Sequence, residues 1–252
     1  RLVAARIKRG RMSCQTFKRG PGPLCTVMLP TRGRPQWLCE SIDSLHSLCR
    51  EKHLIEFILK VDDDDASTLE ILPRLTAILP LKAIISPRGN GYHDMHNWCN
   101  QMAALANGDW LLLWNDDARM ITQDWDQILL TANYEGLWHG CGDICLLVAR
   151  TEDRPDANEF ILLRRKVSQV LGHFSRSPHN DNWIWNLMGS INSAFTAPIM
   201  VKHLSKEIKD DVRDKVLEAY KTTIETLNSM KAVRFRLADA GRLLDYIESR
   251  EE

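Results

Sequence analysis

Charged and small polar residues follow four short apolar runs of the chain. These clusters occupy residues 30–35, 62–67, 87–91 and 115–117, and two of them contain adjacent aspartates. A single aspartate at such a place would serve a turn or a helix cap, but two acidic clusters at strand ends exceed that need. Carboxylates at a strand end suit Mg²⁺ or Mn²⁺, which takes its other ligands from water and phosphate oxygens. The sequence therefore predicts a metal-assisted site for a nucleotide diphosphate.

The commonest nucleotide-binding motifs are absent from the sequence. No G-x-x-x-x-G-K-[ST] segment occurs, and no G-x-G-x-x-G segment follows an expected strand. P-loop and Rossmann dinucleotide modes are therefore disfavoured.

Apolar runs alternate with helical repeats around the charged clusters. Helices are expected over residues 37–49, 68–79, 96–106 and 124–132, and strands over 25–29, 54–61, 82–86, 110–114, 144–149 and 160–163. Pro73 should interrupt the second helix. Residues 172–196 are expected to be irregular, and the charged segment after residue 204 has the spacing of two helices. The pattern predicts an α/β fold whose mostly parallel sheet is flanked by helices, with ligands at the carboxyl ends of the strands.

The composition is typical of a soluble globular protein. The 252 residues are 44% hydrophobic and 26% charged, with 33 basic and 33 acidic side chains, so no overall field favours nucleic acid or a membrane. No apolar run approaches the roughly 20 residues of a membrane span. Seven irregularly spaced cysteines and a start without an apolar signal core predict reduced thiols and a cytoplasmic location.

Charge is uneven along the chain. Residues 1–24 contain seven basic residues and no acidic one. Such an extension is either a solvated segment or an arm that contacts a polyanion. We expect three parts: this basic extension (1–24), a central domain (25–203) and C-terminal helices (204–252).

Several segments together resemble the GT-A glycosyltransferases, in particular the inverting, family-2-like enzymes that use nucleotide sugars. Residues 30–35 are similar to the family's opening P-T-x-x-R-P, and residues 61–67 to its V-D-D-x-S. Residues 100–117 resemble its N-x-A segment followed by G-D, four apolar residues and the D-x-D motif, with Asn115 in the first position of that motif. Residues 179–183 lie where the family has an E-D-x-x-W-like segment. The likeness spans roughly residues 26–203.

The resemblance implies a role for individual residues. Asp181 matches the catalytic base, and Asp63 matches the acid that reads the nucleobase, with Asp62 or Asp65 in another register. Asp117 and His203 match metal ligands for Mn²⁺ or Mg²⁺. The remaining residues that match the nucleotide-sugar site are Thr31, Arg32, Asp62, Asn100 and Asp116.

Simpler explanations compete with these roles. Asp181 precedes an apolar helical run and could be a helix N-cap, in which case His179 could be the base. Asp116 and Asp117 could form a turn after a strand, and His203 could be a surface residue.

The resemblance implies displacement at an anomeric carbon with inversion. The donor is expected to be a nucleotide diphosphate sugar, most simply a UDP-sugar, and the acceptor a hydroxyl of a glycan or small molecule. One alternative acceptor is a hydroxymethylated pyrimidine in DNA, which the basic extension would help to bind. An alternative of another class is a catalytically silent nucleotide-binding scaffold.

Overall fold

The computed structural model describes residues 22–134, 142–154 and 156–250. Most of the predicted basic extension lies outside these residues. The strands are β1 (Cys25–Thr31), β2 (Ile55–Asp62), β3 (Leu81–Ser86), β4 (Trp110–Leu113), β5 (Ala118–Met120), β6 (Leu146–Thr151), β7 (Phe160–Arg164) and β8 (Ala194–His203). The α-helices are α1 (Pro35–Ser47), α2 (Ala66–Ile78), α3 (Met95–Leu105), α4 (Trp125–Tyr134), α5 (Arg165–Leu171), α6 (Asn180–Ser190), α7 (Asp211–Leu227) and α8 (Met230–Glu248), with short 3₁₀ turns η1 (Lys52–Leu54) and η2 (Gly91–Asp94).

All eight strands belong to one sheet, in the order β3-β2-β1-β4-β7-β6-β8-β5. The first four strands in this order are parallel to one another. β7 and β5 join their neighbours antiparallel, while β8 runs parallel to β6. The predicted α/β class with a mostly parallel sheet is therefore confirmed, and the carboxyl ends of β1 to β4 meet at one edge.

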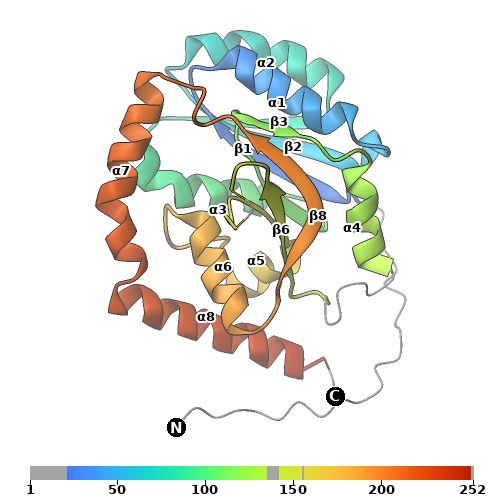
Figure 1. The fold of residues 1–252 in the computed structure, drawn as a ribbon, viewed down its shortest axis with the longest axis vertical. Helices are drawn as coiled ribbons and strands as arrows, with labels where there is room; N and C mark the ends of the chain where they lie inside the picture. The colour runs from blue at the N-terminus through green and yellow to red at the C-terminus, as the bar shows by residue number, and fades with distance from the viewer. Residues whose placement is uncertain (1–21, 135–141, 155, 251–252) are drawn as a thin grey trace.

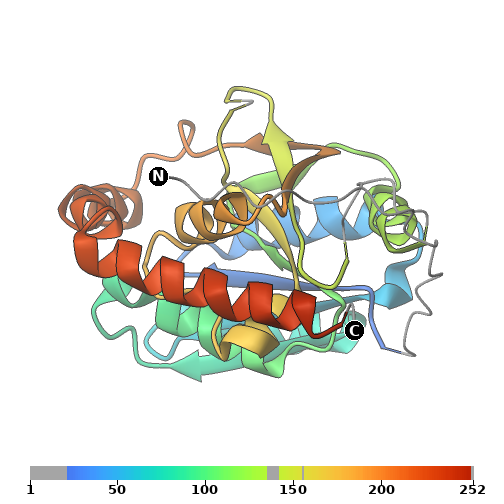
Figure 2. The same ribbon diagram turned by 90° about the horizontal axis from the view of Figure 1, so that it is seen from below.

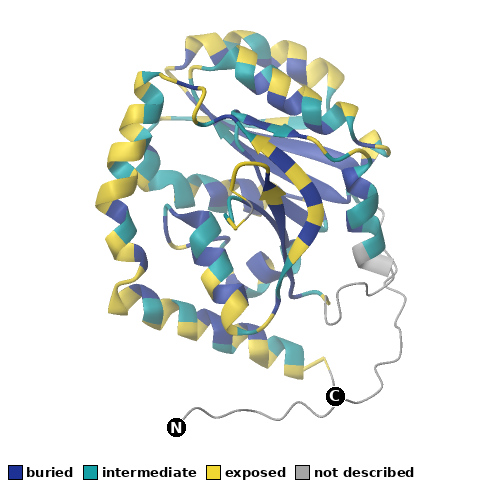
Figure 3. Cartoon of the chain, viewed as in Figure 1, coloured by how far each residue is buried: buried dark blue, intermediate teal, exposed yellow. Residues whose placement is uncertain are grey.

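The two faces of the central strands belong to two separate hydrophobic clusters. In β1, Val27 and Leu29 face one cluster and Met28 faces the other, as the two-residue period of a strand requires. Leu112 and Leu111 of β4 divide in the same way. Figure 3 shows the resulting buried sheet, and also β8, on which buried and exposed residues alternate.

Helices cover both faces of the sheet. The first cluster includes buried side chains of α1, α2 and α4, and the second includes those of α3, α5, α6 and α8. Figure 1 shows α7 running along one side of the molecule from the region of α2 towards α8. Figure 2, viewed from below, shows α8 lying across this end of the molecule. The C-terminal helices thus pack against other helical elements, α8 on α5 and α6 and α7 on η2 and α8, and α8 contributes the fully buried Leu243 to the second cluster.

Gly108 lies where the turn before β4 closely approaches β1. Its amide donates to Thr26 Oγ1 at 2.9 Å. A Cβ atom at this position would collide with the backbone of Cys25 and Thr26, so the turn that leads into β4 requires glycine.

Three expectations from the sequence are wrong. Pro73 does not interrupt α2, because the buried Leu72 and Leu75 hold the helix on the sheet while Pro73 lies on its exposed side. Residues 172–196 are not irregular throughout, since they contain α6, whose low-propensity sequence is stabilised by burial of its apolar face. Cys145 is disulfide-bonded, although Cys25 and Cys49 are free thiols, because irregular spacing does not determine which cysteines pair.

Among the described residues, no helix is long and apolar enough to cross a membrane.

Candidate functional site

A cavity of about 450 Å³ opens at the edge where β1 to β4 end. Because parallel strands bring their carboxyl ends together, segments far apart in sequence meet there. Lining residues come from the β1–α1 and β4–β5 loops, from η2 and α3, and from the segment between β8 and α7. Of the predicted site residues, those that line the cavity are Thr31, Arg32, Asp62, Asp116, Asp117 and His203.

Asp116 is held by residues of the β1–α1 loop. The Thr31 hydroxyl donates to its Oδ2 at 2.8 Å, and Arg34 Nη1 lies 3.3 Å from its Oδ1. Arg34 also donates two bonds of 2.7 Å to Asp210, which tie the N-terminus of α7 to this loop. Burial and the neighbouring charge of Asp117 raise the pKa of Asp116 to about 6, against the opposing effect of Arg34. Asp116 is therefore held in the cavity lining by hydrogen bonds, and its charge is partly compensated by Arg34.

The four consecutive aspartates at the end of β2, residues 62–65, differ in their contacts. Arg32 pairs with both Asp62, at 2.8 Å, and Asp64. Asp65 caps α2 by accepting from the amide of Thr68, and it also accepts from the amide of Gly33 at 2.7 Å. Counter-charges and amides thus offset the mutual repulsion of the carboxylates.

Asp62 and Asp63 are placed differently. Asp62 is buried and lines the cavity, whereas Asp63 is exposed and is not part of its lining. The ammonium of Lys60 reaches Asp62 Oδ1 at 2.5 Å and lies 4.7 Å from the ring centre of Trp98. Together, Lys60, Asp62 and Trp98 form a wall with charge, hydrogen-bonding capacity and an aromatic face, which are the features that bind a nucleobase.

His203 contacts an acidic side chain with each of its ring nitrogens. Its Nε2 lies 3.2 Å from Asp117 Oδ1, and its Nδ1 lies 2.8 Å from Glu159 Oε2. Glu159 also accepts from Arg154 at 2.7 Å. Burial alone would lower the pKa of His203, but the hydrogen bonds to Asp117 and Glu159 outweigh it and raise the pKa to about 9.

The donor set fits a hard divalent ion with two protein ligands. Asp117 and His203 lie side by side in the cavity lining, and Glu159 orients the imidazole through its other nitrogen, Nδ1. A carboxylate that holds the second nitrogen of a histidine is the usual arrangement at metal sites. In the part of the chain that the structure describes, no group of three or more histidine, cysteine or acidic side chains is arranged to hold a metal. A bound ion would therefore depend on phosphate and water oxygens for its other ligands, as Mg²⁺ and Mn²⁺ commonly do.

Asp181 is the second residue of α6 and not its N-cap, which is His179. The carboxylate is within electrostatic range of Tyr92, a residue that lines the cavity, although Asp181 itself is not part of the lining. Burial raises the pKa of Asp181 to about 6, and the charge of Glu159 adds to this effect. A carboxylate with such a pKa can accept a proton near neutral pH.

His179 is fully buried, and protein groups engage both of its ring nitrogens. Nε2 lies 2.9 Å from Thr223 Oγ1, and Nδ1 lies 3.3 Å from the hydroxyl of Tyr92. Burial lowers the pKa of this imidazole. His179 thus connects α6, α7 and η2, and does not face the cavity.

Asn100 is not brought together with the other predicted site residues. Its side chain accepts from the amides of Phe174 and Ser175 and donates to the carbonyl of Ser175, so it holds the loop before α6. It lines a second cavity, described below.

Several residues of the site were missed in the sequence. Glu159 directly precedes β7, so its place beside an expected strand could have indicated a site residue. Arg34 belongs to the charged cluster of residues 30–35. Arg154 and the α7 residues Arg213 and Val216 carry no local signal, because only the three-dimensional structure brings them to the cavity.

Comparison with known proteins identifies the architecture. No family model matches the sequence, and no curated protein matches it. The structure of S. aureus TarS 1-349 is 14% identical, with a TM-score of 0.53, over 88% of this chain and 70% of that one. TarS 1-349 with UDP-GlcNAc is 15% identical, with a TM-score of 0.53, over 82% of this chain and 67% of that one.

A second enzyme shares this architecture. The mannosyltransferase PcManGT from Pyrobaculum calidifontis, in complex with GDP-Man and Mn²⁺, is 15% identical, with a TM-score of 0.56, over 88% of this chain and 81% of that one. Identities this low establish the fold and not the substrate. The chain has the GT-A-like fold of glycosyltransferases.

Proposed function

We propose that the protein is a metal-dependent, inverting glycosyltransferase that moves a sugar from a nucleotide diphosphate donor, most simply a UDP-sugar, to an acceptor hydroxyl. The observation that carries this proposal is the meeting of Asp117, His203 and Glu159 at the cavity that also contains Thr31, Asp116 and Asp62. The structural neighbours hold UDP-GlcNAc or GDP-Man, which supports a nucleotide-sugar donor.

The cavity wall is suited to a diphosphate. Arg154, Lys206 and Arg213 line it, and their charges would attract phosphate oxygens. Asp117 and His203 would hold Mn²⁺ or Mg²⁺, which supplies neutralisation of the diphosphate that departs. Lys60 and Trp98 lie on the wall that would take the nucleobase.

Asp181 is the proposed general base. Because the pKa of its carboxyl is raised to about 6, the side chain is mainly ionised at pH 7 yet basic enough to take the proton of an acceptor hydroxyl. Attack by that oxygen on the anomeric carbon, with departure of the nucleotide diphosphate from the opposite face, inverts the configuration in one displacement.

We favour a glycan or small-molecule acceptor. The alternative acceptor, a hydroxymethylated pyrimidine in DNA, depends on the short basic extension, because the rest of the chain has 26 basic against 33 acidic residues and no excess of positive charge for DNA.

Calorimetry with UDP, with and without Mn²⁺, followed by a screen for hydrolysis of UDP- and GDP-sugars, tests the proposal. Metal-dependent binding together with release of the sugar is expected. UDP binding without any turnover would favour the silent scaffold, and no binding of any nucleotide would refute the proposed function.

A further inference from the structure

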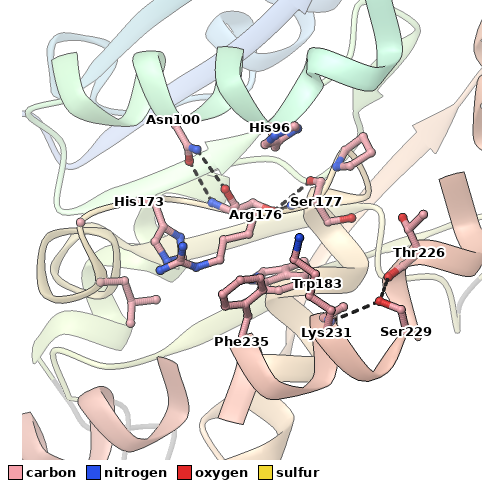
Figure 4. Close-up of a pocket in the computed structure, with 15 residues that line it drawn as sticks. His96, Asn100, His173, Arg176, Ser177, Trp183, Thr226, Ser229, Lys231 and Phe235 are labelled. Carbon is pink, nitrogen blue, oxygen red and sulfur yellow. Dashed lines mark hydrogen bonds between the residues drawn. The ribbon is translucent and has the colours of Figure 1, made fainter. Parts of the chain in front are cut away.

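A second cavity, of about 770 Å³, lies between α3, the loop before α6, and the N-terminus of α8. It shares no lining residue with the first cavity, which lies at the carboxyl ends of β1 to β4. Figure 4 shows His96 and Asn100 of α3 on one side, Lys231 and Phe235 of α8 on the other, and Trp183 of α6 between them. The proposed donor site does not use this cavity.

The wall of this second cavity is positively charged. Arg176 and Lys231 line it, and the described lining residues include no aspartate or glutamate. Arg176 is partly neutralised by Asp239, which is buried behind the wall at 3.3 Å. Lys231 is exposed and makes no ion pair with any described residue. Its charge is therefore available to an anion from solution.

Aromatic side chains lie beside these cations. The guanidinium of Arg176 is 5.3 Å from the ring centre of Phe235, and the ammonium of Lys231 is 6.0 Å from it. Trp183 is only 2% exposed, and its indole Nε1 has no hydrogen-bond partner among the described residues. Since a buried indole N–H usually finds an acceptor, this donor points to a ligand oxygen at the cavity wall.

The start of α8 adds the positive end of a helix dipole. Ser229, the N-cap, accepts from the amide of Ala232, and Ser229, Lys231 and Ala232 all line the cavity. The first amides of a helix lack partners within the helix, and the N-terminal end of its dipole favours negative charge. Positive side chains, the indole N–H of Trp183, the positive end of the α8 dipole and the ring of Phe235 thus converge on one space.

We propose that this cavity is a second ligand site, which binds the phosphate of an organic phosphate ester through Arg176, Lys231 and the N-terminus of α8, with the organic part packed on the exposed ring of Phe235 beside the buried indole of Trp183. A doubly charged phosphate uses several donors at once, which favours it over a carboxylate. The large volume and the exposed ring of Phe235 favour an ester over inorganic phosphate.

The site is connected to the proposed base through one helix. Trp183 and Asp181 are two residues apart in the first turn of α6, and two residues correspond to about 200° of rotation, so they face opposite sides of the helix. A ligand at the indole N–H of Trp183 would therefore contact the segment that positions Asp181 without entering the donor cavity.

The decisive variant is Lys231→Glu, compared with Lys221→Glu. Both lysines are exposed, but Lys221 lies on α7 and lines neither cavity. An acidic residue in the first turn of α8 favours the helix, so Lys231→Glu should fold. The probes are inorganic phosphate, glycerol 3-phosphate and phenyl phosphate, titrated by calorimetry at constant ionic strength.

Phenyl phosphate should bind most tightly because its ring can pack on Phe235. Lys231→Glu should weaken its binding about tenfold or more, the value of one charge-assisted hydrogen bond, while Lys221→Glu binds as the unchanged protein does. Equal affinity in the two variants, or no phosphate binding at all, would refute the proposal. Phenyl phosphate that binds no more tightly than glycerol 3-phosphate would refute the role of Phe235.

A second measurement locates the ligand on the unchanged chain. Reductive methylation followed by peptide mass mapping reports the reactivity of each lysine, with Lys221 as the internal reference. Phenyl phosphate should slow methylation of Lys231 relative to Lys221. Equal rates with and without the probe would place the anion elsewhere, even if calorimetry detects binding. Neither result depends on transferase activity, so failure of this proposal is distinct from failure of the proposed function.

Discussion

The two cavities of this molecule differ in how many of their charged side chains are already paired. At the carboxyl ends of β1 to β4, nearly every acid already has a cation or amide partner, as Arg32 has Asp62 and Arg34 has Asp116 and Asp210. In the cavity beside α8, Lys231 has no ion-pair partner among the described residues, and the buried indole of Trp183 lacks an acceptor.

This difference indicates how each cavity would select a ligand. A network that neutralises itself fixes the positions of Asp116, Asp117 and His203 before a ligand arrives, which suits a site that must align reacting groups. Donors without partners are suited to attract an anion, but they impose less geometry. The first cavity therefore has the features of a reaction site, and the second those of a binding site.

The largest effect is expected for Asp181→Asn, which removes the proposed base. Turnover should fall by about two to four powers of ten while donor binding is nearly unchanged. Because burial raises the pKa of Asp181, its ionised form is disfavoured in the folded protein, so the variant should lose no thermal stability. Asp43→Asn, on the exposed side of α1, is the control. A variant with normal turnover, or one that simply unfolds, would contradict the role.

Asp117→Asn should abolish the metal-dependent part of UDP binding. The amide is a poor ligand for a hard cation, and His203 alone cannot replace it. Calorimetry with and without Mn²⁺, and circular dichroism to verify folding, would test this expectation. Unchanged affinity in a folded variant would exclude Asp117 as a metal ligand.

A smaller loss is expected for Glu159→Gln. Glu159 is within hydrogen-bonding distance of His203 Nδ1 and orients the ring towards Asp117, so the variant should bind Mn²⁺ about 10- to 100-fold more weakly in the presence of UDP. Glu152→Gln is the matched control, since Glu152 is exposed on the same segment. Equal Mn²⁺ affinity in the two variants would show that Glu159 only packs against the ring.

The pH profile should show the same base in the unchanged protein. Asp181 must be ionised to accept a proton, and its pKa is raised to about 6, so turnover is retained above this pH and falls about tenfold for each unit below it. Initial rates at saturating donor, measured between pH 5 and pH 8, would check this. A rate that stays constant as the pH falls through 6 would argue against a carboxylate base with this pKa.

The smallest effect concerns the basic extension. If DNA is the acceptor, deletion of residues 1–19 should reduce the slope of log affinity against log salt by about one unit for each phosphate that the extension neutralises. If the acceptor is a glycan, transfer should be equal with and without the extension. Sugar found on hydroxymethylpyrimidine DNA, and not on unmodified DNA, would overturn our preference.

Sequence reasoning works best for the four parallel strands and the loops that follow them. There the alternation of strands and helices is local, and the motifs lie at strand ends, so the meeting of Thr31, Asp62 and Asp116 follows from the fold class alone. His203 is reached only through family resemblance; it lies 3.2 Å from Asp117, and its role as a metal ligand stays a prediction.

Other features depend on tertiary packing. The helix α6 has a sequence with weak helical preference and forms because Ile184 and Leu187 are buried. The wall formed by α7 is set by ion pairs such as Arg34 with Asp210, between residues remote in sequence. The cavity beside α8 combines side chains from four segments, none of which carries a binding motif by itself.

The pairing of β5 with β8 has a consequence for how the protein folds. Ala118 lies opposite His203 in this antiparallel ladder, and the amide of Leu204 donates to the carbonyl of Asp117. The proposed metal ligands can therefore meet only after the chain has been made as far as β8, whereas β1 to β4 and their loops need only the first half of the sequence. During synthesis, the strand ends that hold Thr31, Asp62 and Asp116 are therefore complete in the chain before the contact between Asp117 and His203 can form.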